Sequence, residues 1–172
     1  MTVKTILTEP NRVLRQVSKN VDKVSDEERA LMDDMLDTMY DAPGIGLAAI
    51  QIGVPKRIIV MDISRDEDKK EPRYFVNPII KKKNEEKVKY EEGCLSVPGQ
   101  FAEIERPNTC EVEYLDYYGK KQLLKADGLL ATCIQHEMDH LEGILFIDYL
   151  SKLKKSMIIK KLSKIKLNRE IF

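Results

Sequence analysis

The stretch Leu129-Leu-Ala-Thr-Cys-Ile-Gln-His-Glu-Met-Asp-His-Leu-Glu-Gly143 decides how this chain is built. Its apolar residues recur at helical intervals and a glycine stands at each end, which predicts a helix. Both histidines of the chain, His136 and His140, lie in it four residues apart. Four residues turn a helix by about 400°, so the two imidazoles can share a metal ion, with Glu137 beside them. A helix whose surface happens to carry two histidines and two acids is the simpler alternative.

A metal site of the catalytic zinc type needs a third protein ligand and leaves one position for water. No further histidine exists, so cysteine is the natural candidate. Cys133 shares the helix face, but it would spread the ligands over about 10 Å of helix axis. Cys110 alternates with apolar strand residues, which predicts a buried and inert thiol. Cys94 remains, and we expect a site made of two histidines and this cysteine.

The surroundings of Cys94 favour this interpretation. Gly93, Pro98 and Gly99 interrupt the strand texture, so we expect a loop that presents the thiolate and nearby backbone N–H groups. A closed structural zinc site would need a fourth protein ligand, for which only the other two cysteines are left.

A third segment, Gly44-Ile-Gly-Leu-Ala-Ala-Ile-Gln51, is rich in glycine and alanine. Its glycines permit close approach by a ligand, and the Gln51 amide could stabilise a developing oxyanion without adding charge. Tight packing is the alternative for such an apolar segment. The segment lacks the Lys-Ser/Thr ending of a phosphate-binding loop.

The rest of the pattern indicates an α+β fold. Ser25 and Glu28 have the spacing of a capping box and predict a helix over residues 26–40. Between residues 57 and 125, short β-branched and aromatic runs predict antiparallel strands. These runs are Ile58–Val60, Tyr74–Val76 and Cys110–Tyr114.

Residues 149–172 form a third helical candidate with one apolar stripe. The stripe consists of Leu150, Leu153, Met157, Ile158, Leu162 and Ile165. The same segment holds seven lysines, Arg169 and one acid, for a net charge of +7. A lysine face can dock on RNA or on an anionic surface, whereas a solvated face over a packed stripe is the alternative.

Length and composition limit the classes of protein. With 172 residues, 42% hydrophobic and 34% charged, we expect a single domain over residues 1–172 and exclude disorder and a membrane-embedded protein. The net charge is zero, so no overall field draws the chain to DNA or to lipid. Three cysteines cannot form a closed disulfide framework, and the N-terminus is too polar for a secretory signal, so we expect a cytoplasmic protein with reduced thiols.

Together the three segments resemble the ordered motifs of the bacterial peptide deformylase family. The motifs are Gly44-Ile-Gly-Leu-Ala-Ala-Ile-Gln51, Glu92-Gly-Cys-Leu-Ser96 and Gln135-His-Glu-Met-Asp-His-Leu-Glu-Gly143. The resemblance covers nearly the whole chain, because the opening Ile6-Leu7, Pro10 and Leu14-Arg15 are also similar. It implies an α+β fold with antiparallel sheet around a central metal-binding helix.

The resemblance also implies an activity: removal of the formyl group from the N-terminal formylmethionine of new polypeptides, which releases formate. It makes Cys94, His136 and His140 the metal ligands and Glu137 the acid/base. Gln51 and the backbone N–H of Leu95 would hold the formyl oxygen.

The remaining roles rest on the same resemblance. Fe²⁺ is the favoured metal, with Zn²⁺, Ni²⁺ and Co²⁺ as alternatives, and the basic C-terminal helix is expected to bind the ribosome. The methionine pocket or its rim is assigned to Ile45, Gly46, Leu129 and Cys133. Glu92 is expected to anchor the cysteine loop by backbone hydrogen bonds, or to be a solvated acid.

Two positions depart from the family pattern. Phe101 stands where several members carry an arginine, and Thr132 stands where a bulkier aliphatic residue is common. Two other functions compete with a deformylase. One is a metallopeptidase that cleaves internal peptide bonds, and the other is a non-enzymatic, metal-stabilised module that binds ribosomes.

Overall fold

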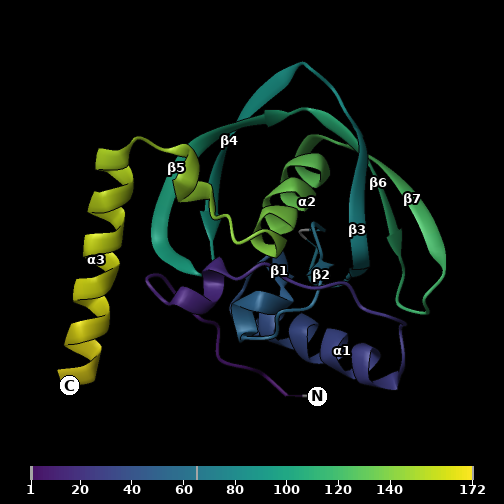
Figure 1. Ribbon diagram of the computed structural model, residues 1–172, viewed down its shortest axis with the longest axis horizontal. Coiled ribbons are helices and arrows are strands. Elements are labelled where there is room, and N and C mark those ends of the chain that lie inside the picture. The colour runs from purple at the N-terminus through teal and green to yellow at the C-terminus, as the bar shows by residue number, and fades with distance from the viewer. Residues whose placement is uncertain (1, 65, 172) are drawn as a thin grey trace.

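The helix that carries both histidines occupies the centre of the molecule. The structure is a computed structural model that describes residues 2–64 and 66–171. In it, α2 (Gly128–Leu141) runs between two groups of strands (Figure 1). Residues 131–138 of α2 are all buried, so this helix has no free surface along most of its length. The predicted helix and its bounds are confirmed.

Five antiparallel strands form the larger sheet, in the order β1-β2-β3-β6-β7. The strands are β1 (Gly46–Ala48), β2 (Ile58–Met61), β3 (Arg73–Lys83), β6 (Thr109–Leu115) and β7 (Lys121–Asp127). They include all three runs that the sequence assigned to strands. The predicted α+β class with antiparallel sheet around a central helix is therefore confirmed.

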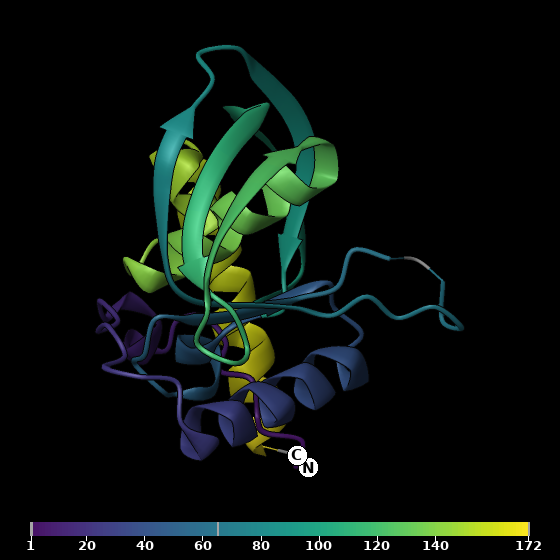
Figure 2. The same cartoon turned by 90° about the vertical axis from the view of Figure 1, so that its right-hand side faces the viewer.

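Strand β2 is apolar throughout because both of its faces are buried. Ile59 and Met61 pack in the cluster that includes the apolar residues of α2. Ile58 and Val60 point to the opposite face and pack with the methionines of α1 (Asp26–Asp41). The larger sheet thus lies between α1 and α2 at this point, and Figure 2 shows the two helices on its opposite sides.

Helix α1 begins where the capping pattern predicted. The backbone N–H of Ser25 donates to Glu28 Oε1 at 3.1 Å, and the Ser25 hydroxyl bonds the same carboxylate. This carboxylate satisfies a backbone donor that the first helical turn leaves unpaired.

The smaller sheet is the hairpin of β4 (Lys87–Cys94) and β5 (Val97–Pro107), joined through Leu95 and Ser96. Its register shifts from the pair Gly93–Phe101 to the pair Cys94–Val97, so residues 98–100 bulge out of the ladder. The loop expected around Cys94 is therefore a tight turn followed by a bulge. Pro98 fits within a strand here because this sheet has only two strands and leaves β5 an open edge.

Three short 3-10 helices connect these elements: η1 (Arg12–Arg15), η2 (Ala49–Ile52) and η3 (Phe146–Tyr149). The third follows α2 and leads to α3 (Lys152–Ile171), which lies along one side of the molecule next to β5 (Figure 1). The tail helix thus starts at residue 152 rather than 149, and residue 172 lies outside the described residues.

The apolar stripe predicted for the tail is only partly covered. Leu162 is buried, and Leu150 and Ile158 pack beside it on a cluster that includes Leu14 and Phe146. Three other members of the predicted stripe are exposed, namely Leu153, Met157 and Ile165. The alternative of a fully packed stripe under a solvated face therefore does not hold, because α3 contacts β5 and η3 and these elements cover only some of its apolar residues.

Candidate metal centre

The fold brings the predicted cysteine onto the histidine helix. Cys94 ends β4, and its Sγ lies 3.4 Å from Nε2 of His140. The ligand atoms of Cys94, His136 and His140 all lie within 4.8 Å of one another. In the part of the chain that the structure describes, no fourth histidine, cysteine or acid joins this group. Three convergent donors without a fourth are the arrangement of a catalytic metal site rather than a closed structural one.

Both histidines are buried, at 8% and 0% exposure, so the alternative of a surface helix with incidental histidines is wrong. Burial lowers the pKa of His140 well below its ordinary value and keeps this imidazole neutral, as a metal ligand must be. Burial also lowers the pKa of His136, but hydrogen bonds to Cys94 and Glu92 outweigh this effect and raise it. Protons and metal ions compete for an imidazole, so an ion bound at His136 requires the neutral ring. Thiolate and imidazole donors suit Fe²⁺, Co²⁺, Ni²⁺ and Zn²⁺, so the residues present fit such an ion.

Glu92 has a different environment from the one expected. Its Oε1 lies 2.9 Å from Nδ1 of His136, and both carboxylate oxygens accept from Arg106, at 2.6 and 2.9 Å. Burial raises the pKa of Glu92, but the hydrogen bonds from His136 and Arg106 outweigh this effect and lower it. The carboxylate is thus neither solvated nor bonded to the backbone of its loop. It fixes which ring nitrogen of His136 faces the metal position, because Nδ1 is already engaged.

Glu137 is buried beside the three candidate ligands. Its Oε1 lies 3.8 Å from Nε2 of His136, and its Oε2 is buried without a hydrogen-bond partner in the described residues. Burial raises the pKa of Glu137 from 4.5 to about 7. Such a carboxyl group can both accept and donate a proton at neutral pH.

The glycine-rich segment adjoins this carboxylate directly. A Cβ placed on Gly46, in β1, would lie 2.8 Å from Oε1 of Glu137. Gly46 therefore makes room for the Glu137 side chain. Leu95 packs against the same segment, because a Cβ on Gly44 would lie 2.6 Å from its side chain.

Gln51 follows β1 and is almost fully buried. Its side-chain oxygen accepts from the backbone N–H of Ala48 at 2.9 Å, which fixes the orientation of the amide. The amide nitrogen then faces the hairpin turn, 3.0 Å from Oγ of Ser96 and 3.6 Å from Sγ of Cys94. Gln51 thus faces the turn that contains Leu95, the residue predicted to share its role.

The residues predicted for the methionine pocket have unequal exposure. Ile45 is 43% exposed and Leu129 is partly buried. Cys133 is buried in the central apolar cluster. Burial raises the pKa of its thiol well above the ordinary value. The departure at Phe101 has a clear position, since its ring covers Gly93 next to Cys94.

Sequence reasoning missed the residues behind Glu92. Arg106 is buried and also donates to Asp139 Oδ2 at 2.9 Å. Burial lowers the pKa of Arg106, but its bonds to Glu92 and Asp139 outweigh this effect and raise it. Asp139 stands next to His140 within the predicted motif, which was a usable signal. The sequence carries no comparable signal for Arg106, because only the pairing of β4 with β5 brings this residue to Glu92.

The fold and the site define a class: an α+β metallohydrolase with a histidine pair on a buried helix and a cysteine supplied by a hairpin. In the described residues, none of the helices has the length and apolar character that crossing a bilayer requires. The polypeptide deformylase family model matches residues 3–156.

Relatives extend this match over the whole chain. A peptide deformylase of Pelagibacter ubique is 86% identical and is aligned over 99% of each chain. A crystal structure of peptide deformylase from Ehrlichia chaffeensis superposes with a TM-score of 0.91 at 44% identity and covers 96% of this chain and 97% of that one. A second structure of the Ehrlichia enzyme, in complex with actinonin, has a TM-score of 0.90 at 48% identity and covers 95% and 98%.

This chain belongs to the peptide deformylase family. Like the family, it is a metal-dependent hydrolase that removes the formyl group from the N-terminal methionine of nascent polypeptides. Membership decides against the metallopeptidase and the non-enzymatic module considered from the sequence.

Proposed function

We propose that Cys94, His136 and His140 are the metal ligands of this deformylase and that Glu137 is its acid/base. The observation that carries the proposal is the convergence of the three ligand atoms within 4.8 Å, next to a buried carboxyl group. When bound there, a divalent ion lowers the pKa of a water molecule to about 7 and polarises the formyl carbonyl.

Glu137 moves the proton in this scheme. Its unpartnered Oε2 accepts the proton of the attacking water and later returns it to the departing amine of methionine. A pKa of about 7 makes both steps accessible to one group at neutral pH. Gly46 lacks a Cβ and so leaves the room that the carboxylate occupies beside β1.

Gln51 and the backbone N–H of Leu95 stabilise the oxyanion that forms from the formyl oxygen. An amide nitrogen has two donors, so Gln51 can keep its bond to Ser96 and direct the second N–H to the substrate. Each well-placed donor of this kind typically contributes about 2.7–4 kcal/mol to the transition state.

The methionine side chain of the substrate binds next to this centre, against Ile45, Gly46, Leu129 and Cys133. Burying a methionine side chain gains roughly 1.5–3 kcal/mol over leaving it in water. Glu92 acts behind His136 rather than on the substrate, because its carboxylate is already taken by His136 and Arg106.

Fe²⁺ is the native ion that we propose, with Zn²⁺, Ni²⁺ or Co²⁺ as substitutes. Anaerobic purification followed by elemental analysis tests this, paired with the turnover of each metal form. Iron in the purified protein and the highest turnover for the Fe²⁺ form support the proposal. Zinc in the purified protein together with the highest turnover for the Zn²⁺ form contradicts it.

The wider setting is also proposed. Residues 1–172 act as one catalytic domain in the cytoplasm, and α3 binds the ribosome. Among the α3 side chains that the structure describes, five lysines are exposed, namely Lys152, Lys154, Lys160, Lys161 and Lys164. Binding to ribosomes should weaken steeply with salt, since it depends on phosphate contacts. Binding that is unchanged after removal of the tail would contradict this role.

The ligand assignment is tested by metal content and formate release from formyl-Met peptides. Cys94→Ala, His136→Ala and His140→Ala should each lose both metal and turnover. Cys110→Ala is the matched control, because this thiol is buried in the apolar core and outside the ligand group. A Cys94→Ala protein that keeps stoichiometric metal and full turnover would refute the assignment.

A further inference from the structure

A chain of polar contacts leads from the metal centre to the far side of α2. It starts at His136, passes through Glu92 and Arg106, and continues beyond them to Asp139 and Tyr149. Oδ2 of Asp139 accepts both from Nη1 of Arg106 at 2.9 Å and from the hydroxyl of Tyr149 at 2.7 Å. A single carboxylate oxygen therefore joins the buried guanidinium to a tyrosine on η3.

The tyrosine ring makes a second contact with the same guanidinium. Cζ of Arg106 lies 5.1 Å from the centroid of the Tyr149 ring, within the range of a cation–π contact. Burial and the hydrogen bond to Asp139 raise the pKa of Tyr149 to about 12, so its hydroxyl stays protonated as a donor at neutral pH. Tyr149 thus touches both partners of the Arg106–Asp139 ion pair.

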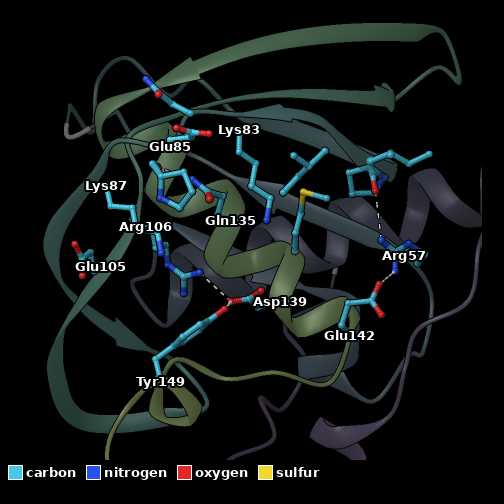
Figure 3. A pocket seen from close by; sticks show the side chains of 16 residues that line it. Arg57, Lys83, Glu85, Lys87, Glu105, Arg106, Gln135, Asp139, Glu142 and Tyr149 are labelled. Atoms are coloured by element: carbon cyan, nitrogen blue, oxygen red, sulfur yellow. Dashed lines mark hydrogen bonds and ion pairs between the residues drawn. The ribbon is translucent and has the colours of Figure 1, made fainter.

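The Tyr149 end of this series of polar contacts lies at an open cavity. Figure 3 shows Arg106, Asp139 and Tyr149 together in the wall of a cavity of about 710 Å³, with the hydroxyl pointing at Asp139. Tyr149 is 53% exposed, whereas Arg106 is 5% exposed. The tyrosine is therefore the point at which the network meets solvent.

The geometry gives Tyr149 a way to act on His136. Oε1 of Glu92 is shared between Nδ1 of His136 and Nη2 of Arg106, so the position of Arg106 sets the rotation of this carboxylate. Asp139 occupies the remaining arm of the guanidinium and is oriented in turn by the Tyr149 hydroxyl. Each member of this path is hydrogen-bonded to the next, and such connected networks restrict the geometry of their members.

We propose that Tyr149 is a positioning residue of the metal centre, which acts through Asp139, Arg106 and Glu92 to hold the His136 imidazole in its ligating orientation. This inference rests on the proposed role of His136 as a metal ligand. It places one determinant of metal retention on the segment that leads into the C-terminal helix, outside all three sequence motifs.

The test compares Tyr149→Phe with the wild type in the Co²⁺-loaded full-length protein. Phenylalanine keeps the ring over Arg106 and removes only the hydroxyl. The release of Co²⁺ to a chelator should become about 3- to 10-fold faster, equivalent to the loss of one ordinary hydrogen bond. The visible absorption bands of Co²⁺ should also shift, because they report ligand geometry. Tyr118→Phe is the matched control, since this tyrosine is 73% exposed and remote in sequence from the motifs.

A merely structural role would give another result: Tyr149→Phe would lower thermal stability while the Co²⁺ spectrum and release rate stayed at their wild-type values. That outcome overturns the proposal. Asp139→Asn provides a second variant, with release faster by roughly 10-fold or more, as is typical for groups that support a ligand. In the Asp139→Asn background, Tyr149→Phe should have little added effect, because both changes break the same path. Full additivity would contradict the path through Asp139.

His136→Ala separates this inference from the proposal beneath it. If His136→Ala loses Co²⁺ but Tyr149→Phe leaves release and spectrum unchanged, the ligand assignment stands and the positioning role is refuted. If His136→Ala retains Co²⁺ with the wild-type spectrum, the ligand assignment itself fails.

Discussion

Helices α2 and α3 were both predicted from apolar periodicity, yet the molecule uses them in opposite ways. α2 is enclosed by strands, and partners on other elements orient two of its polar side chains: Glu92 orients His136, and Arg106 orients Asp139. α3 contacts β5 and η3 on one side and leaves Leu153 and Met157 exposed. A helix that is enclosed can hold reacting groups at fixed positions, whereas a helix on the side can change without moving them. Catalysis should therefore respond sharply to changes around α2 and weakly to changes in α3.

The largest effect is expected for Glu137→Gln on α2. Glutamine keeps the size of the side chain but cannot accept the proton of water, so kcat should fall by about 10²- to 10⁴-fold while bound metal is retained. Formate release and elemental analysis on the same sample measure both. Glu142→Gln is the control, because this acid of the same helix end is 52% exposed and pairs with Arg57. Unchanged turnover in Glu137→Gln would remove its role as acid/base.

The substitution Gly46→Ala should have the next largest effect on turnover, because its methyl group would clash with the Glu137 side chain. The added Cβ of Gly46→Ala would lie 2.8 Å from Oε1 of Glu137 and push the carboxylate out of position. A displacement of about 1 Å at a reacting group can lower turnover by roughly 100-fold. Metal content should stay at the wild-type level. A wild-type kcat in this variant would show that the carboxylate tolerates displacement and that α2 is less constrained than we infer.

The contrast between the helices also explains which parts of the site could be predicted. The histidine pair was accessible because residues four apart on a helix share a face, which is a local property. Cys94 followed by elimination from three cysteines. The partnership of Glu92 with Arg106 was not accessible, because it depends on how the β4–β5 hairpin pairs and then packs over α2. The periodicity of α3 predicted a helix, but no pattern in one chain states how much of an apolar stripe a neighbour will cover.

On α3, Leu162→Ala should lower the free energy of unfolding and leave kcat unchanged. Leu162 is 3% exposed and packs beside Leu14 and Phe146, so its truncation should lower the free energy of unfolding by about 2 kcal/mol. Leu153→Ala is the matched control, and at 73% exposure it should change this free energy by less than about 0.5 kcal/mol. Urea unfolding and kcat are measured for both. A loss of kcat in Leu162→Ala comparable to that of Gly46→Ala would break the comparison.

The smallest effect is expected for Lys155→Met, which removes an ion pair between α3 and the body of the molecule. Nζ of Lys155 lies 2.7 Å from Oδ1 of Asp148 on η3, and both side chains are partly exposed. Burial raises the pKa of Asp148, but hydrogen bonds from Arg15 and Lys155 outweigh this effect and lower it below 3.8. A carboxylate whose pKa is lower in the folded state than in the unfolded state stabilises the fold. This stabilisation is fully present at pH values above the pKa of the unfolded state, and it is lost as the pH falls through the pKa of the folded state.

Lys155→Met should therefore lower the free energy of unfolding by about 0.5 kcal/mol at pH 7, a typical value for an exposed pair. The difference from the wild type should shrink as the pH falls below the ordinary pKa of aspartate, about 3.9. Urea unfolding at neutral and acidic pH measures it, with Lys154→Met as the control for loss of an exposed lysine. A difference that persists in acid would mean that Lys155 acts through its aliphatic stem rather than through its charge.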